Sequence, residues 1–327
     1  MKIFSFPHVV LYELMKQFEP VDLIKLSFCS KSAHAVVKTF SKVEEDLKIY
    51  SVENFGYCIA FPSQLLIGVI SEANMTLLEQ DPETHFRLKE WTKWFRHLHI
   101  CQDVIQGFRE TTNYICDLLK VPVSVVILDR ERDLWMWNFA VERQEQKLKE
   151  VYIRSHFPVS AENYSSFLNN TTQILECWSR PPQDYRFDGK LPTVRNLFIS
   201  NGLWITREHL LGLESPNAKL FRTRLESSDI NALLRVWLDG GFANLKSLLI
   251  HGRKYDGTIF EGVRDRLEPV QRIVSYKWDS FEGFAIFDTN DFHIRGADGV
   301  VATVKLDFRE FRMAVWPDSS GQRVQFV

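Results

Sequence analysis

The sequence lacks paired cysteines. Its five cysteines, Cys29, Cys58, Cys101, Cys116 and Cys177, stand singly, and no CxxC pair occurs. An odd and scattered set indicates reduced thiols rather than a disulfide framework, as in proteins of the cytosol or nucleus. We therefore expect a cytoplasmic or nuclear protein.

Long apolar runs are missing as well. Those present, such as Val125–Leu128, are far shorter than the roughly 20 residues that span a bilayer. The first ten residues lack the long apolar region of a secretory signal, and Pro7 interrupts what apolar character they have. We expect neither a membrane partner nor a secretory leader.

An excess of charge of either sign is also absent. The 327 residues include 40 basic and 42 acidic ones, for a net charge of −2, so no global attraction to nucleic acid is expected. The motifs GxxxxGK[ST], GxGxxG, GxSxG and HExxH do not occur. The common fingerprints of nucleotide-binding proteins, hydrolases and zinc enzymes are thus missing, and we expect no catalytic site and no cofactor.

Two short stretches could still carry chemistry. His97 and His99 would share one face of a strand and could bind a metal, but no Cys, His or Asp companion stands at ligand spacing. Asp129–Asp133 alternates charges and could supply an acid and a base, although such a run after a strand usually forms a solvated turn. We favour the structural interpretation of both stretches and expect no metal site.

Phe6–Phe40 has the clearest pattern in the chain. Pro7 suits the first turn of a helix, and Glu19-Pro20 ends that helix and lets Pro20 open a second one. Ser30 can cap a third. The first helix carries an amphipathic stripe of Val10, Leu11, Leu14, Met15 and Phe18. Three helices this short have more apolar surface than they can bury among themselves, so this surface must face the rest of the chain or a partner.

Three interpretations of this helical head follow. It could bind a partner protein, it could be a structural cap packed on the remaining chain, or it could be a helix-turn-helix DNA reader. Residues 1–42 hold six lysines, three acids and no arginine. Because DNA readers rely on the arginine fork, the third interpretation is disfavoured.

The same residues resemble an F-box. The matching pattern is Phe6-Pro7, Leu11, Leu14, Phe18-Glu19-Pro20, Asp22-Leu23-Ile24, Leu26-Ser27 and Cys29-Ser30-Lys31, and the run EPVDLIKLSFCSK is similar to F-boxes of families expanded in nematodes. The sequence departs from the family at Phe6, where leucine is usual, and at Ser32–Ala35, where a more basic segment is common. The resemblance implies binding to the Skp-type adaptor of a cullin-RING ubiquitin ligase. The adaptor-binding residues would be Phe6, Pro7, Val10, Leu11, Leu14, Met15, Phe18, Pro20, Leu23 and Leu26.

The remaining chain predicts a body of strands and helices. Residues 47–70 read as short strands joined by turns, rich in Ile, Val, Tyr and Phe. Further strands are expected at 98–100, 123–128, 151–153, 197–200, 219–221 and 245–250. Helices are expected at 104–119, 161–175, 206–213 and 228–240. A repeat of one strand and one helix every twenty-odd residues suggests a degenerate leucine-rich-repeat-like horseshoe, without a recurring Asn or Cys position.

The chain closes with antiparallel strands at 292–295, 300–308 and 311–316, with Asp298-Gly299 in a hairpin turn. The fold class is thus α+β or α/β. Residues 190–316 resemble the F-box-associated type 2 region, through Leu197-Phe198-Ile199, Trp204-Ile205-Thr206 and the closing segment Phe311–Trp316, among others. We expect an F-box over residues 1–45 and a target-binding domain over residues 46–327.

Two aromatic residues are candidates for target contact. Trp135 and Trp137, in the segment RDLWMWNF, are the tryptophans that we expect to be exposed, because aromatic anchors are enriched at interfaces. The chain would then be a non-catalytic target-recognition subunit of a Skp–cullin–F-box ligase, with the adaptor, through it a cullin, and an unknown protein target as partners. The alternative is a scaffold outside any ligase with a structural helical cap. An enzyme whose residues are distant in sequence is a third and more remote possibility.

Overall fold

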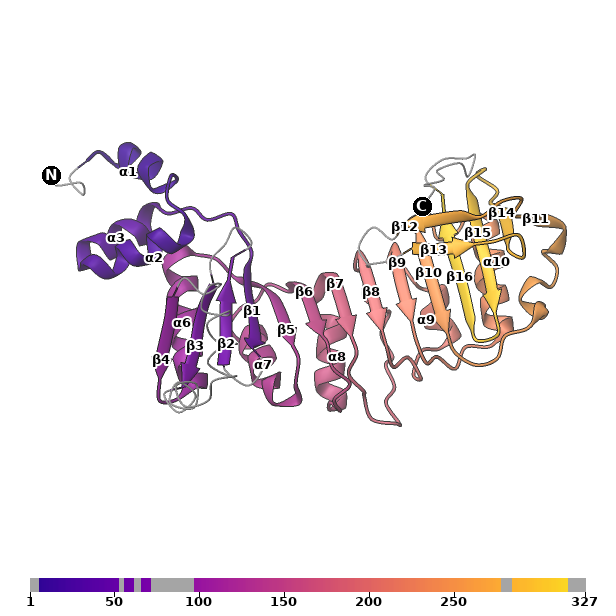
Figure 1. Cartoon of the computed structure of the whole chain (residues 1–327), viewed down its shortest axis with the longest axis horizontal. Helices are drawn as coiled ribbons and strands as arrows, with labels where there is room; N and C mark the ends of the chain where they lie inside the picture. The colour runs from indigo at the N-terminus through magenta and orange to yellow at the C-terminus, as the bar shows by residue number, and fades with distance from the viewer. Residues whose placement is uncertain (1–5, 53–55, 62–65, 72–96, 278–283, 317–327) are drawn as a thin grey trace, which may run out of the picture. The chain divides into compact units, whose positions relative to one another are not determined.

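The computed structural model describes residues 6–52, 56–61, 66–71, 97–277 and 284–316 (Figure 1). The chain forms two compact units, Met1–Leu148 and Lys149–Val327. The head belongs to the first unit, so a boundary at residues 45/46 stays a prediction. The fold is mixed α and β, with helices first and strands of parallel and antiparallel pairing after them.

The head consists of helices α1 (His8–Met15), α2 (Pro20–Cys29) and α3 (Lys31–Phe40). Pro20 occupies the first turn of α2, and the Ser30 hydroxyl accepts the Ala33 N–H at 3.0 Å, so both predicted start signals are confirmed. The three helices share a small core of fully buried side chains: Leu11, Met15, Leu23, Ala33 and Val37.

The first unit continues with a five-stranded sheet in the order β5-β1-β2-β3-β4. Its strands are β1 (Leu47–Val52), β2 (Gly56–Ala60), β3 (Leu66–Ser71), β4 (His97–Cys101) and β5 (Val123–Leu128). The outer pairs β1–β5 and β3–β4 are parallel, and the inner pairs are antiparallel. Helix α6 (Val104–Leu119) packs on β2–β4 and also contacts α2 and α3, whereas α7 (Leu134–Glu142) packs on β5. Helix α6 therefore links the head to the sheet.

The second unit begins with the strands β6 (Leu148–Ile153), β7 (Thr171–Cys177), β8 (Asn196–Ile199), β9 (Asn217–Leu220) and β10 (Ser247–His251). Strands β7 to β10 are parallel. The helices α8 (Ala161–Asn169), α9 (Arg207–Leu211) and α10 (Ser227–Leu238) lie on one face of the strands (Figure 1). The expected helix over 161–175 is wrong in its second half, because the β-branched Thr171, Thr172 and Ile174 form β7.

The last strands extend this sheet by antiparallel pairing. The strands β16 (Glu310–Val315), β15 (Val301–Asp307), β14 (Phe292–Arg295) and β11 (Leu267–Pro269) follow β10 in that order. Gly299, at φ +83°, makes the predicted hairpin turn between β14 and β15. The hairpin of β12 (Val274–Lys277) and β13 (Phe284–Phe287) lies across the other face (Figure 1). Its side chains share a buried cluster with Leu249, Ala314 and Trp316.

A ladder of buried polar side chains crosses the parallel strands. Asn217 donates from Nδ2 to Asn196 Oδ1 at 3.1 Å, and the Ser247 hydroxyl donates to Asn217 Oδ1 at 2.7 Å. These three residues occupy one register row across β8, β9 and β10. Asn196 and Asn217 are equivalent in successive strands, but Ile174 takes this position in β7 and Ser247 in β10, so asparagine does not recur consistently.

Candidate functional site

The head exposes part of its apolar surface. Of the residues predicted to bind an adaptor, Phe6, Pro7, Val10 and Phe18 are exposed, Leu14 and Leu26 are half-buried, and Leu11, Met15, Pro20 and Leu23 are buried in the unit itself. The buried side chains form the core of the head. An outside partner can therefore touch only the exposed and half-buried members.

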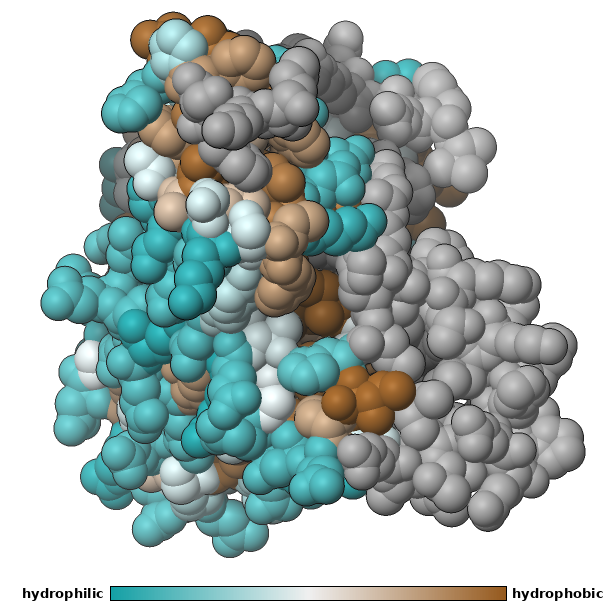
Figure 2. Space-filling model, turned by 90° about the vertical axis from the view of Figure 1, so that its left-hand side faces the viewer, coloured by the Kyte–Doolittle hydropathy of each residue, from teal (hydrophilic) through white to brown (hydrophobic). Residues whose placement is uncertain are grey.

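Two exposed apolar residues were missed by the sequence pattern. Val9 is 74% exposed and Phe28 is 69% exposed, beside 46% for Val10. Val9 lies just outside the predicted stripe of the first helix. An apolar residue that lies off the stripe expected to be buried is a candidate for exposure, and this signal could have identified Val9 from the sequence. Figure 2 shows apolar surface, in brown, in the upper part of the view, which is the level at which Figure 1 draws the head.

The other side of the head is held against α6 by one tyrosine. The Tyr114 hydroxyl lies 2.6 Å from the Ser27 hydroxyl and 3.3 Å from His34 Nδ1. The Tyr114 ring stacks on Phe28, with 5.2 Å between centroids and 8° between planes. Beside this contact, α2 and α6 border a largely apolar groove of about 550 Å³. The head thus uses α2 and α3 to contact the body.

The two tryptophans proposed for target contact lie inward on α7. Trp137 is 1% exposed, so its expected exposure is wrong. Trp135 is half-buried, donates from Nε1 to the Tyr57 hydroxyl at 3.1 Å and packs edge-on against the Tyr57 ring. The run after β5 leads into a helix and not into a loop, and Trp135 packs on Tyr57 of β2 and Phe108 of α6 while Trp137 is buried.

The charged run after β5 is not wholly a solvated turn. Asp133 is fully buried, and its Oδ2 lies 3.3 Å from Arg130 Nε at the start of α7. A buried carboxylate requires a partner, and Arg130 provides one for Asp133. Because Asp133 directly precedes α7, the ion pair helps to fix the start of this helix. A role in acid–base chemistry has no support from this geometry.

The histidine and cysteine side chains that could bind a metal or act as nucleophiles do not form such a site in the described residues. The exposed His99 lies 2.8 Å from the Thr111 hydroxyl through Nδ1. No group of three or more His, Cys, Asp or Glu side chains able to hold a metal ion occurs among the described residues. Burial raises the pKa of Cys58 to about 12 and those of Cys116 and Cys177 to about 11, so these thiols are poor nucleophiles.

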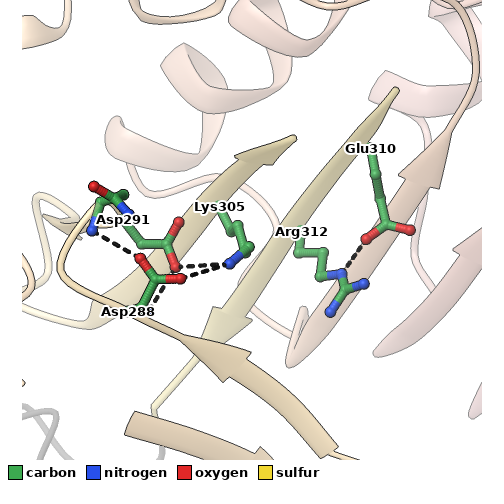
Figure 3. Close-up of polar contacts among 6 residues, drawn as sticks. Asp288, Asp291, Lys305, Glu310 and Arg312 are labelled. Carbon is green, nitrogen blue, oxygen red and sulfur yellow. Dashed lines mark hydrogen bonds and ion pairs between the residues drawn. The ribbon is translucent and has the colours of Figure 1, made fainter. Parts of the chain in front are cut away.

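Figure 3 shows a group of charged side chains in the second unit that has a structural role. Lys305 Nζ lies 3.0 Å from Asp288 Oδ2 and 3.5 Å from Asp291 Oδ2, and Arg312 Nε pairs with Glu310. The Asn290 N–H and Lys305 lower the pKa of Asp288, whereas burial raises the pKa of Asp291. The cluster ties the turn between β13 and β14 to strand β15. Both carboxylates already have partners.

The face of the second unit opposite the helices carries polar and aromatic side chains. Glu176, Phe198 and Lys219 form one register row across β7, β8 and β9. The Trp178 ring lies 4.5 Å from Phe198 and donates from Nε1 to Glu176 at 2.7 Å. Burial, together with the nearby Arg312 guanidinium, lowers the pKa of Lys219 to about 8.

Replacing Lys219 with methionine is expected to stabilise the second unit at pH 7 by about 1 kcal/mol, allowing for solvent screening of a half-exposed group. The folded state binds this proton less tightly than the unfolded state, so the penalty is full below about pH 8 and fades as the pH approaches 10.5. Urea denaturation of Lys219→Met and wild type at pH 7 and pH 10.5 measures it. An equal gain at both pH values would contradict the burial penalty.

No helix within the described ranges combines the length and apolar character needed to cross a membrane.

Comparison with known proteins gives two family matches. Residues 3–44 match the F-box domain, and residues 191–250 match the family described as F-box associated. The chain is 25% identical over 334 residues to the Skn-1 dependent zygotic transcript 15 protein of Caenorhabditis elegans, with 94% of each chain covered. No solved structure matches the chain significantly.

Proposed function

We propose that this chain, which carries an F-box domain and an F-box associated region, is the target-recognition subunit of a Skp–cullin–F-box ubiquitin ligase. The head binds a Skp-type adaptor and through it a cullin, and the body holds a protein target. Both matched regions are typical of non-catalytic receptors. The working compartment is then the cytosol or the nucleus.

The observation that carries the proposal is the apolar surface that α1 exposes in the described part of the chain. Val9 and Val10 are exposed although the head already has its own core, and Phe6 and Phe18 add to this surface. Apolar side chains grouped at a surface mark a site of protein association when nothing in the chain covers them. We place the adaptor contact here rather than on Leu11, Met15 and Leu23.

The body contributes position rather than chemistry. Holding a target beside the transferring enzyme raises its effective concentration there, as linked binding modules do. The contacts of Tyr114 with Ser27 and Phe28 support this role, because they restrict the motion of the head against α6. The parallel strands, their intervening helices and the polar ladder support a leucine-rich-repeat-like body.

The test is co-purification of the full-length chain with a Skp-type adaptor, comparing wild type with Val9→Asp/Val10→Asp. The double variant should bind at least about 100-fold more weakly, because each aspartate would be buried unpaired in the interface. The helix should persist, since acidic residues in a first turn favour the helix dipole. The matched control is Ile273→Asp/Phe308→Asp, which changes two exposed apolar residues of the second unit.

Retention of the adaptor by the α1 variant would overturn the assignment of this surface. Failure of the wild type to bind any Skp-type adaptor would overturn the ligase role and favour the scaffold. The head does pack on the body, as a scaffold's cap would, but through α2 and α3, while Val9 and Val10 of α1 are exposed among the described residues.

A further inference from the structure

The β12–β13 hairpin covers part of the sheet face opposite the helices of the second unit (Figure 1). Its buried side chains Val274, Ala285 and Phe287 share one cluster with residues of β10, β15 and β16. Trp316, directly after β16, belongs to the same cluster, and its ring packs edge-on against Tyr276 of β12 at 5.7 Å. The position of the Trp316 ring therefore affects how the hairpin packs on the sheet.

Two hydrogen bonds in series hold the Trp316 ring. The indole Nε1 donates to the Thr303 hydroxyl at 2.7 Å, and the same hydroxyl lies 2.8 Å from His293 Nδ1. Thr303 is fully buried. His293 and Thr303 are register partners on β14 and β15, and they lie on the face that the hairpin covers, because Val301, two positions before Thr303, belongs to the cluster.

The direction of both bonds follows from counting hydrogens. An indole N–H can only donate, so the Thr303 oxygen accepts from Trp316. Thr303 has a single hydroxyl hydrogen, and His293 Nδ1 is the one acceptor for it among the described residues. His293 must then be neutral, with its own hydrogen on Nε2. Burial lowers the pKa of His293, against the opposing effect of the Glu268 carboxylate, which also favours the neutral ring at pH 7.

The other charged groups near His293 already have partners. Glu268, its register partner on β11, is exposed and is the charge that acts on the pKa of His293. The further titratable or charged residues on this face come from β13 to β16 and from the hairpin: Tyr276, Asp288, Asp291, Arg295, Lys305, Glu310 and Arg312. Lys305 pairs with both aspartates, Arg312 pairs with Glu310, and Arg295 donates to the Gly299 carbonyl.

We propose that His293 is a proton-sensitive latch for the β12–β13 hairpin. When His293 takes up a proton, Nδ1 becomes a donor and faces a Thr303 oxygen that already accepts from Trp316. The Thr303 hydrogen then loses its acceptor in a fully buried site, and a buried donor without an acceptor is costly. A shift of Trp316 relieves this conflict and loosens its packing with the hairpin. The latch goes beyond the proposed function and does not depend on it.

The sign of the pH dependence follows from the same bonds. The folded state binds the His293 proton less tightly than the unfolded state, because burial lowers the pKa of the folded group. The hairpin is therefore held fully above the ordinary histidine pKa of about 6.5, and its packing weakens as the pH falls below that value.

The test uses the full-length chain in two measurements. Nitrogen NMR of the histidine-labelled protein at pH 7.5, with His293 assigned by the signal lost in His293→Gln, should show hydrogen on Nε2 and none on Nδ1. Hydrogen exchange of the amides at 274–277 and 284–287, corrected for the intrinsic effect of pH, should lose about tenfold in protection between pH 7.5 and pH 5.0 in wild type, the usual effect of one lost hydrogen bond.

His293→Asn should keep its protection at both pH values, because the Asn Oδ1 can take the place of Nδ1 as an acceptor that does not titrate. The matched control is His156→Asn, at an exposed position of the same unit, which should respond to pH as wild type does.

Hydrogen on Nδ1 at pH 7.5, or unchanged protection of wild type at pH 5.0, would overturn the latch. An equal loss in acid in His293→Asn would also overturn it and would assign the response to Asp288, Asp291 and Lys305. If His293→Asn already loses protection at pH 7.5, the nitrogen signals of wild type decide by themselves, because they report the tautomer directly.

Discussion

Replacing Trp137 with alanine is expected to destabilise the first unit by about 3–5 kcal/mol, the usual cost of deleting a large buried aromatic ring. Its ring is 1% exposed on α7, which packs on β5. Urea denaturation, followed by circular dichroism, measures the loss.

The matched comparison is Trp135→Ala, two positions earlier on the same helix. Trp135 is half-buried and has one indole hydrogen bond to Tyr57, so a smaller loss of about 1–3 kcal/mol is expected. Equal losses, or a neutral Trp137→Ala, would contradict the inward orientation of Trp137 and restore it as a candidate for target contact.

Replacing Asn217 with aspartate is expected to destabilise the second unit by about 3–5 kcal/mol at pH 7. The Asn217 amide donates to Asn196 Oδ1 and the Arg195 carbonyl and accepts from Ser247, and all of this lies among buried side chains. Aspartate has nearly the same shape but loses both donors and places a charge where it is desolvated.

The pH dependence distinguishes charge from shape. Burial would raise the pKa of the new carboxyl in the folded state above its unfolded value, so the penalty should grow as the pH rises through about 4 and shrink at lower pH. Thermal melts at pH 4 and pH 7 measure this. Asn244→Asp, at an exposed position, is the control and should be near neutral. A pH-independent loss in Asn217→Asp would show that the ladder's donors matter and its burial does not.

The helix boundaries of the head and the last hairpin turn could be predicted from the sequence, because each is fixed by residues next to it in the chain. Pro7, Pro20 and Ser30 set the boundaries of the head helices, and Asp298-Gly299 set the last hairpin, since each fixes the backbone of its own turn. The same residues made the F-box resemblance visible. The strand at 171–177 was missed because it follows the helix after a single residue, with no proline or glycine to mark the boundary.

Burial and long-range pairing were decided by the tertiary structure alone. Leu11 and Leu23 turn inward and Val9 and Val10 outward because α3 covers only one side of α1 and α2. Trp137 is buried because α7 lies on β5, and Asn196 and Asn217 meet only when β8 and β9 pair in register.

The loops that follow the parallel strands of the second unit show the same division. Arg186, Arg207 and Arg224 are ordinary loop residues in the sequence, far apart along the chain. They line one cavity because parallel strands bring successive loops to the same edge of the sheet. The sequence by itself thus determined the local elements and the family resemblance of this protein. Which side chains remain available to a partner was decided by packing, because exposure depends on neighbours that are distant in sequence.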